Sequence, residues 1–192
     1  MGQLPGRSMD ESAVIAAYPD KGYTGERKMQ ALASLATPIG PLGLAASPAG
    51  LAEVNLSGPV GPDTPDAAAE PTLAAAIAQL TEYFAGERQV FDVPLDWSAM
   101  GGLRLRVLQA LYAEVPYGKT VTYGDLATMA GAPDAARAVG GIMNSNPLPV
   151  IVPCHRVVAS DGLGGFGGGL EMKRWLLTRE GYLPPTLDWA FD

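Results

Sequence analysis

The sequence predicts an α+β fold in which a small N-terminal domain, made of a β-meander and a helix, packs on a mostly helical C-terminal domain with a helix-turn-helix. Short apolar runs broken by proline and glycine turns fill residues 31–56, which is typical of a meander. Apolar residues recur at helical spacing in residues 73–84 and again in 103–115. Two further short helical segments flank a turn at residues 131–133, and this pattern favours a helix-turn-helix.

The chain length bounds the number of domains. Its 192 residues suit one domain or two small domains that share an interface. We divide the chain into a loosely ordered arm (residues 1–30), an N-terminal α/β domain (31–97), a C-terminal domain that carries the candidate chemistry (98–185) and a tail (186–192).

Local signals predict the elements of the N-terminal domain. The sequences Thr-Pro-Ile-Gly at 37–40 and Ser-Pro-Ala-Gly at 47–50 break the meander into short strands. Residues 57–71 are rich in proline, glycine and aspartate and are predicted to be a loop, after which Thr72 caps a helix that ends at Gly86. One apolar face of this helix contains Leu73, Ile77, Leu80 and Phe84.

The C-terminal domain follows an extended segment at residues 89–97. Its first helix covers residues 103–115, where apolar residues lie four apart, and a Pro-Tyr-Gly sequence stops it. The sequence Thr122-Tyr-Gly-Asp125 is a capping-box pattern and predicts a second, short helix. Pro133 is predicted to open a third helix that runs to about Asn144, because proline is tolerated in the first turn of a helix.

The single cysteine and the single histidine exclude several classes of protein. One cysteine cannot form an internal disulfide, and two Cys/His residues are too few for a structural zinc site. We therefore predict no metal. No apolar run approaches the roughly 20 residues that a bilayer-spanning helix needs, and the N-terminus lacks the apolar stretch of a signal peptide. These features predict a cytoplasmic protein.

Charge is unevenly distributed along the chain. The formal net charge is −7, whereas residues 101–180 contain eight basic and six acidic side chains. The overall acidity argues against a general binder of polyanions, while the more basic C-terminal half is able to bind phosphate groups. An ordinary solvated surface accounts for the asymmetry equally well.

Residues 146–158 carry the candidate chemistry. The Val-Ile-Val run at 150–152 is strand-like, but three prolines in this segment remove hydrogen-bond donors, which predicts an edge strand or a rigid loop. Cys154 is followed by His155 and Arg156, the residue types that help a thiol to become a nucleophilic thiolate. A small buried cysteine beside a structural histidine stays an alternative, because neighbours on a strand point to opposite faces.

Five motifs in the second half closely resemble those of the O6-alkylguanine-DNA alkyltransferases (methylated-DNA–protein-cysteine methyltransferases). In chain order they are PYGKTVTYGDLA at 116–127, AARAVGG at 135–141, Asn146-Pro147, PCHRVV at 153–158 and LLTREG at 176–181. The resemblance runs from about residue 103 to 181 and implies a C-terminal domain that binds DNA and transfers alkyl groups. The N-terminal meander and helix look like the ribonuclease-H-like domain of the same family.

The resemblance implies direct DNA repair by a single-turnover transferase. The alkyl group of O6-alkylguanine, and of O4-methylthymine, is expected to pass irreversibly to Cys154 after the damaged base is flipped out of the helix. A thioether has no good leaving group, so each molecule reacts once. The lesion itself is the alkyl donor, so no cofactor is expected. The implied partner is double-stranded DNA carrying O6-alkylguanine, with no membrane; the protein is expected to be a monomer, with cooperative binding on DNA left open.

The resemblance also implies roles for four residues in the chemistry. Cys154 matches the alkyl acceptor of the family. His155 matches the base that removes the thiol proton through a water molecule, and Glu180 matches the acid that orients the imidazole. Asn146 resembles the hinge residue between the recognition helix and the active-site loop.

A second set of residues is expected to handle the DNA. Tyr123 looks like the residue that turns the target phosphate and contacts the flipped base. Arg137 resembles the finger that fills the vacated place in the base stack from the minor groove, and Ala136 and Gly140 belong to the same DNA-facing helix. The pocket for the base is expected to be formed by Met143, Pro149, Val157, Phe166 and Gly167.

A protein class without catalysis is the main alternative. Alkyltransferase-like proteins bind alkylated DNA and mark it for other repair systems, but they lack the acceptor cysteine, commonly carrying tryptophan in its place. This chain has Cys154 at that position. It departs from many relatives at Phe166, where tyrosine is common, and at residues 102–104, where Pro-Phe-Gln is common. These departures bear on affinity and on the range of alkyl groups.

Overall fold

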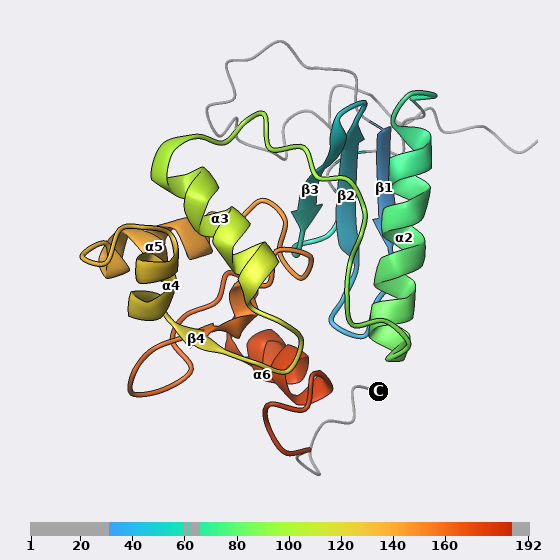
Figure 1. Cartoon of the computed structure of the whole chain (residues 1–192). Helices are drawn as coiled ribbons and strands as arrows, with labels where there is room; N and C mark the ends of the chain where they lie inside the picture. The colour runs from blue at the N-terminus through green and yellow to red at the C-terminus, as the bar shows by residue number, and fades with distance from the viewer. Residues whose placement is uncertain (1–30, 60, 62–65, 186–192) are drawn as a thin grey trace, which may run out of the picture.

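The computed structural model describes residues 31–59, 61 and 66–185. A three-stranded sheet with helix α2 (Glu70–Ala85) on one face forms the N-terminal domain, and four shorter helices form most of the C-terminal domain beside it (Figure 1). The predicted α+β class is confirmed. The predicted N-terminal arm and C-terminal tail lie outside the described residues, and the limits given for the domains stay predictions.

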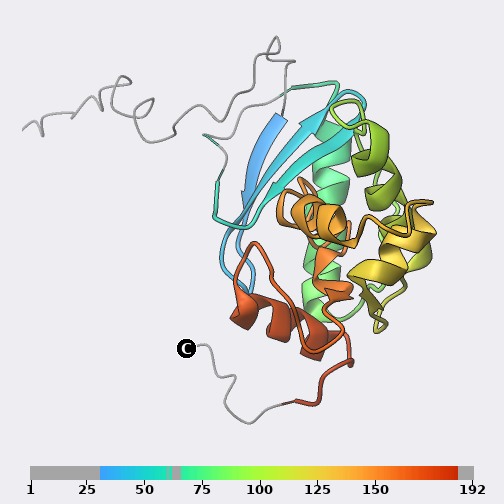
Figure 2. The same cartoon turned by 90° about the vertical axis from the view of Figure 1, so that its left-hand side faces the viewer.

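The N-terminal sheet is an antiparallel meander. Strands β1 (Ala31–Leu35), β2 (Leu42–Ser47) and β3 (Gly50–Asn55) are paired in the order β1-β2-β3. Every residue of the central strand β2 is buried; β1 and β3 flank this strand, and α2 packs against all three strands (Figure 2). The two turns that the proline–glycine sequences predict therefore produce the expected meander.

Helix α2 begins earlier than the sequence predicted. Thr72 is not its cap: the helix starts at Glu70, after Ala69, and no side chain caps it. The backbone carbonyl of Asp66 accepts hydrogen bonds from the N–H groups of Ala69 and Glu70 (2.9 and 2.8 Å), which satisfies two donors of the first turn. The proline at position 71 fits inside this turn because its missing N–H is not needed there. Gly86 ends the helix with φ 86°, as predicted.

The C-terminal helices are α3 (Gly102–Glu114), α4 (Tyr123–Met129), α5 (Ala136–Asn144) and α6 (Leu170–Arg179). The capping box predicted for α4 is confirmed: Asp125 N donates to Thr122 Oγ1 (3.1 Å), and Thr122 N donates to Asp125 Oδ2 (3.2 Å). Helix α5 starts at Ala136 and not at Pro133. The preceding residues form a tight turn, because Ala135 N donates to Ala132 O (2.9 Å) before the helical pattern begins.

A short parallel strand pair joins the helix-turn-helix to the candidate active-site segment. Strand β4 (Val121–Thr122) immediately precedes α4 and pairs with β5 (Val157–Val158). Strand β5 directly follows a 3₁₀ turn, η1 (Cys154–Arg156). The pairing therefore fixes the first turn of α4 close to Cys154, although about 30 residues separate them in the sequence.

Contacts between the two domains reach the same region. Val54 N on β3 donates to the carbonyl of Pro147 (2.8 Å), and Arg179 Nη2 at the end of α6 donates to the carbonyl of Phe84 on α2 (2.8 Å). The N-terminal domain thus supports the residues on either side of η1 in sequence. None of the described helices has the length and apolar character needed to cross a membrane.

Candidate active site

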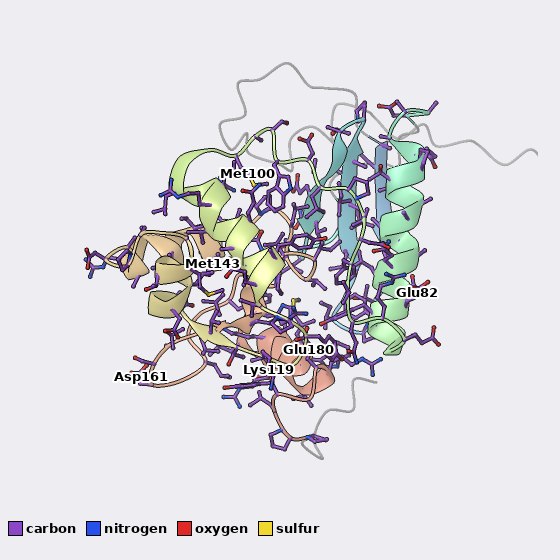
Figure 3. All side chains as sticks on the ribbon, viewed as in Figure 1. Glu82, Met100, Lys119, Met143, Asp161 and Glu180 are labelled. Carbon is purple, nitrogen blue, oxygen red and sulfur yellow. The ribbon has the colours of Figure 1, made fainter. Side chains whose placement is uncertain are left out.

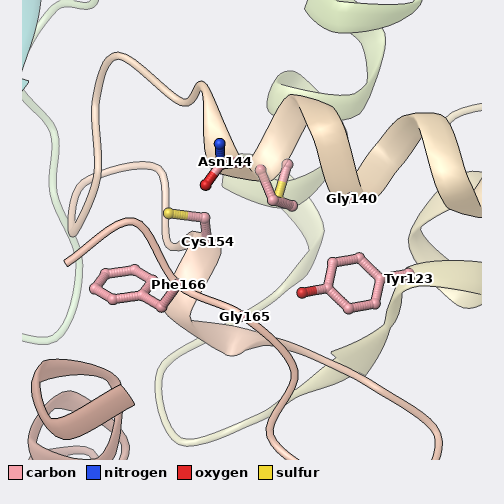
Figure 4. A pocket seen from close by; sticks show the side chains of 7 residues that line it. Tyr123, Gly140, Asn144, Cys154, Gly165 and Phe166 are labelled. Carbon is pink, nitrogen blue, oxygen red and sulfur yellow. The ribbon is translucent and has the colours of Figure 1, made fainter. Parts of the chain in front are cut away.

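Cys154 lines a small pocket. The cavity has a volume of about 70 Å³ and is lined by Tyr123, Gly140, Met143, Asn144, Cys154, Gly165 and Phe166. Figure 4 shows the sulfur of Cys154 pointing into the space between Asn144 and Phe166, with the hydroxyl of Tyr123 facing the same space. Only 5% of the Cys154 surface is exposed, so the thiol is reached through this pocket and not from the open surface.

A buried polar cluster begins at the residue after the cysteine. Nε2 of His155 lies 2.7 Å from Oε1 of Glu180, and both side chains are fully buried. Because a carboxylate only accepts hydrogen bonds, Nε2 carries the ring proton of the neutral imidazole. The other ring nitrogen, Nδ1, is buried and has no hydrogen-bond partner among the described residues. An imidazole that acts as a base accepts a proton at such a free lone pair.

Glu180 is held by donors from three other residues as well. The Arg156 guanidinium donates through Nε to Oε2 (2.9 Å) and through Nη2 to Oε1 (3.0 Å). Tyr83 Oη donates to Oε1 (2.8 Å) and Gly118 N to Oε2 (3.2 Å). Burial acts to raise the pKa of the Glu180 carboxyl, but the hydrogen bonds of His155 and Arg156, the charge of Arg156 and, at low pH where the imidazole is protonated, the charge of His155 outweigh it and hold the pKa at about 2. The carboxylate is therefore ionised at neutral pH.

The resting charge states follow from burial. Burial raises the pKa of the Cys154 thiol to about 11, against the opposing effects of the Asn146 side chain and of Lys173. Burial also lowers the pKa of His155, and the nearby Arg156 and Lys173 charges add to this effect, although Glu180 acts to raise it. At neutral pH Cys154 accordingly carries a protonated thiol, and its sequence neighbour His155 carries a neutral imidazole. The thiol is the candidate nucleophile, and the neutral imidazole is the candidate base that removes its proton.

Asn146 fastens the loop that leads to the cysteine. Its Nδ2 donates to the carbonyl of Val152 (2.8 Å), and its Oδ1 accepts from the N–H of Leu148 (3.0 Å). Val152 N in turn donates to Leu148 O (2.8 Å), so residues 147–152 form a closed turn and not a strand. Within it, Val150 has φ 72°, a conformation that costs a β-branched residue about 1–3 kcal/mol and persists where the surroundings impose it.

Lys173 on α6 fastens the glycine-rich loop at residues 162–169. Its side chain is fully buried, and the ammonium group donates to the carbonyls of Val157 (2.7 Å), Leu163 and Gly165 (3.1 Å). Burial lowers the pKa of Lys173 to about 8, with the charge of Cys154 acting in the opposite direction. One cation thus holds three backbone carbonyls and acts electrostatically on the cysteine as well.

Tyr123 approaches the pocket from the helix-turn-helix. It is half-buried in the first turn of α4, where a Cβ added to Gly164 would lie 2.9 Å from its hydroxyl oxygen. Gly164 also has φ 68°, so both its conformation and its contact with the tyrosine require glycine. Burial raises the pKa of Tyr123, which keeps the hydroxyl protonated at neutral pH.

Helix α5 carries the other residues expected to face DNA. Ala136 and Arg137 lie in its first turn, where the Arg137 side chain is exposed, and Gly140 lies one turn further along and lines the pocket. The helix therefore presents a cation to solvent and a glycine to the space in front of Cys154.

The predicted base pocket and the observed pocket overlap in part. Met143 and Phe166 line it as expected, whereas Pro149, Val157 and Gly167 are not among its lining residues. Val157 is fully buried in β5. A Cβ added to Gly167 would lie 3.9 Å from the carbonyl oxygen of Asn144. Asn144, Gly165, Lys173 and Tyr83 were not predicted. Lys173 could have been found from its helical spacing with Leu176 and Leu177, the buried residues of α6.

Two family models match this chain. Residues 103–182 match the DNA binding domain of 6-O-methylguanine DNA methyltransferase, and residues 32–97 match the ribonuclease-like domain of the same family. The two matches cover both parts of the fold described above.

Curated proteins and solved structures are similar over most of the chain. The methylated-DNA–protein-cysteine methyltransferase of Mycobacterium tuberculosis is 43% identical over 162 residues, which are 81% of this chain and 95% of that protein. The DNA base-flipping protein of Thermus thermophilus is 42% identical over 153 residues, which are 78% of this chain and 99% of that protein. The crystal structure of Mycobacterium tuberculosis OGT in complex with DNA matches with a TM-score of 0.66 and 42% identity, covering 79% of this chain and 93% of that one.

Proposed function

The chain belongs to the 6-O-methylguanine DNA methyltransferase family. We propose that the protein transfers the alkyl group of damaged DNA to the sulfur of Cys154. Its activity is direct alkyl-transfer repair of DNA, and it binds DNA. The observation that carries the assignment of Cys154 is its place in the lining of a pocket, one residue before the His155 of the buried His155–Glu180 pair.

The chemistry begins with activation of the thiol. The Sγ–H proton passes, through a bridging water, to Nδ1 of His155, the ring nitrogen that has no partner among the described residues. Oε1 of Glu180 accepts the hydrogen bond of Nε2–H at 2.7 Å and stabilises the imidazolium that forms. The thiolate benefits from the nearby positive charge of Lys173, which favours the ionised sulfur.

Alkyl transfer then follows as a displacement at carbon. The thiolate electron pair forms a bond to the alkyl carbon, and the bond between that carbon and O6 of guanine breaks. The electron pair of the broken bond stays with the base, which takes up one proton and is left as ordinary guanine. The products are a thioether at Cys154 and repaired DNA, and the chain has no second thiol to remove the group. Each protein molecule reacts once.

The substrate is double-stranded DNA with an O6-alkylguanine, or an O4-methylthymine, that leaves the base stack. An atom inside a duplex reaches a protein pocket only if the nucleotide is extruded, which costs a few kcal/mol of unstacking. Arg137 on the exposed first turn of α5 fills the vacated position, and Tyr123 at the pocket edge receives the base. The protein acts as a monomer in the cytoplasm.

Mass spectrometry tests the assignment of Cys154. The protein is mixed with a duplex that contains one O6-methylguanine, and the intact protein and its peptides are then weighed. We expect one methyl group per molecule, on the peptide that contains Cys154, and no gain in Cys154→Ser. A methyl group found on another peptide would overturn the assignment.

The same experiment separates repair from lesion marking. A base-flipping protein without transfer activity would bind the methylated duplex and gain no mass, and similarity to the Thermus thermophilus base-flipping protein makes this outcome the informative alternative. Binding by Cys154→Ser with an affinity near that of the wild type is expected in either case, because the substitution leaves the DNA-facing helix intact.

Arg137→Ala tests the proposed role in base extrusion. We expect repair of O6-methylguanine in duplex DNA to slow by about tenfold or more, because nothing replaces the lost stacking partner. Reaction with free O6-benzylguanine, which needs no extrusion, should stay close to that of the wild type. Arg174→Ala, which removes the same charge from an exposed position on α6, is the matched control. Equal losses on duplex and free base would contradict this role.

A further inference from the structure

Tyr83 connects the N-terminal domain to the proton-relay cluster. It lies near the end of α2, is fully buried, and donates its hydroxyl hydrogen to Oε1 of Glu180 at 2.8 Å. The two residues are 97 positions apart in the sequence. Figure 3 shows Glu180 in the interior, where the end of α6 meets the lower part of α2, while Glu82 on α2 lies at the surface.

The aromatic surroundings fix the position of the hydroxyl. The Tyr83 ring packs against Phe91, with ring centroids 5.4 Å apart, and meets the edge of Tyr117 at 6.2 Å. The adjacent Phe84 carbonyl accepts a hydrogen bond from Arg179, the residue before Glu180. The end of α2 and the end of α6 are therefore joined at two consecutive residues on each side, which leaves the tyrosine hydroxyl little freedom to turn away from the carboxylate.

Oε1 of Glu180 is shared between Tyr83 and His155. This one oxygen lies 2.8 Å from Tyr83 Oη, 2.7 Å from His155 Nε2 and 3.0 Å from Arg156 Nη2. A carboxylate oxygen has two lone pairs, so three donors compete for it. The strength with which Oε1 holds the imidazole therefore depends on how much of its acceptor capacity the tyrosine occupies.

We infer that Tyr83 is a positioning residue for alkyl transfer, supplied by the N-terminal domain, whose hydroxyl holds Oε1 of Glu180 and limits how strongly that oxygen engages His155. This role rests on the proposed function of Cys154 and His155. It makes the N-terminal domain a part of the reaction site, in addition to its packing role. Removal of the hydroxyl leaves Oε1 more available to Nε2 and so favours the imidazolium.

The charged and titratable groups around His155 are few. Glu180, the residue that caps the C-terminal end of α6, and Lys173 within α6 both act on it, and from η1 it has Arg156 and Cys154 as neighbours in the sequence. Tyr83 on α2 donates a hydrogen bond to Glu180, the partner of His155. Substituting Tyr83 thus changes one hydrogen bond to the partner of His155 and leaves these charges in place.

Nuclear magnetic resonance of the free protein tests this inference without DNA. His155 is the sole histidine of the sequence, so the imidazole signals of a protein labelled with ¹³C- and ¹⁵N-histidine belong to it alone. In Tyr83→Phe we expect the imidazole to titrate at higher pH than in the wild type. Replacement of Tyr83 by 3-fluorotyrosine, a stronger donor of nearly the same shape, should move the titration to lower pH. The low-pH limb of the repair rate should move in the same direction in each variant.

A purely structural tyrosine predicts a different result. It would lower the melting temperature of Tyr83→Phe and leave the imidazole titration of both variants on the wild-type curve, and that outcome would overturn the inference. If Tyr83→Phe does not fold, the 3-fluorotyrosine protein decides alone. Tyr112→Phe is the matched control, since it removes a hydroxyl that donates to the carbonyl of Phe91 and should leave the titration unchanged. Failure of methyl transfer to Cys154 would not affect this measurement, so the two hypotheses fail separately.

Discussion

Glu180→Gln is expected to destabilise the protein by about 3–5 kcal/mol, the usual effect of removing one partner from a buried ion pair. The amide keeps the shape of the side chain but accepts hydrogen bonds only at its oxygen. In one orientation its NH₂ group faces the donors of Arg156 and Gly118, and in the other it faces those of Tyr83 and His155, so two donors lose their acceptor. The Arg156 guanidinium is then buried without its counter-charge. Urea unfolding at neutral pH measures the loss. Repair should also slow by about 100-fold or more, because the imidazolium of His155 loses its stabilising anion.

The pH dependence of stability gives an independent measure of the same carboxylate. The folded pKa of about 2 lies below the ordinary value of 4.5, so the stabilisation is complete above about pH 4.5 and disappears as the pH falls toward 2. The difference corresponds to about 3 kcal/mol at neutral pH. We expect the wild type to lose this amount on acidification and Glu180→Gln to lose correspondingly less.

Glu82→Gln is the control for both measurements. Glu82 lies on the surface of α2, where it pairs with Arg88 in contact with solvent, and such pairs contribute about 0–1 kcal/mol. A loss in Glu82→Gln as large as that in Glu180→Gln would mean that the buried network does not account for the effect.

Lys173→Met is expected to release the glycine-rich loop and slow repair by about 10- to 100-fold, since small displacements of reacting groups have effects of this size. Methionine keeps the apolar stem but leaves the carbonyls of Val157, Leu163 and Gly165 without their shared donor. Gly165 and its neighbour Phe166 line the pocket, so the loss acts on the space that receives the base. Single-turnover repair of methylated duplex measures the rate.

Hydrogen exchange distinguishes release of this loop from general destabilisation. The amides of residues 162–169 should exchange faster in Lys173→Met, while those of the sheet at residues 42–55 stay protected. Lys119→Met, at an exposed position before β4, removes the same charge and should change neither rate nor exchange. An unaltered repair rate in Lys173→Met would show that the loop holds its position without the lysine.

Motifs and periodicity determined most of the fold. The meander, the capping box at Thr122 and the end of α2 at Gly86 depend on residues adjacent in sequence, and each appears where it was expected. The starts of α2 and α5 were misplaced, because a proline is compatible with both a turn and the first turn of a helix. Only the hydrogen bonds made by the neighbouring backbone groups, such as those to Asp66 O and Ala132 O, decide between the two.

The sequence by itself determined which residues carry the chemistry, through the motif around Cys154 and its resemblance to a known family. The tertiary structure alone decided how those residues act on one another. Distant segments supply the partners of these buried groups. Backbone carbonyls accept hydrogen bonds from Lys173, and Arg156 and Tyr83 donate to the Glu180 carboxylate. The cost of burying a charge is set by its partners in space, and a linear pattern of residues does not specify those partners.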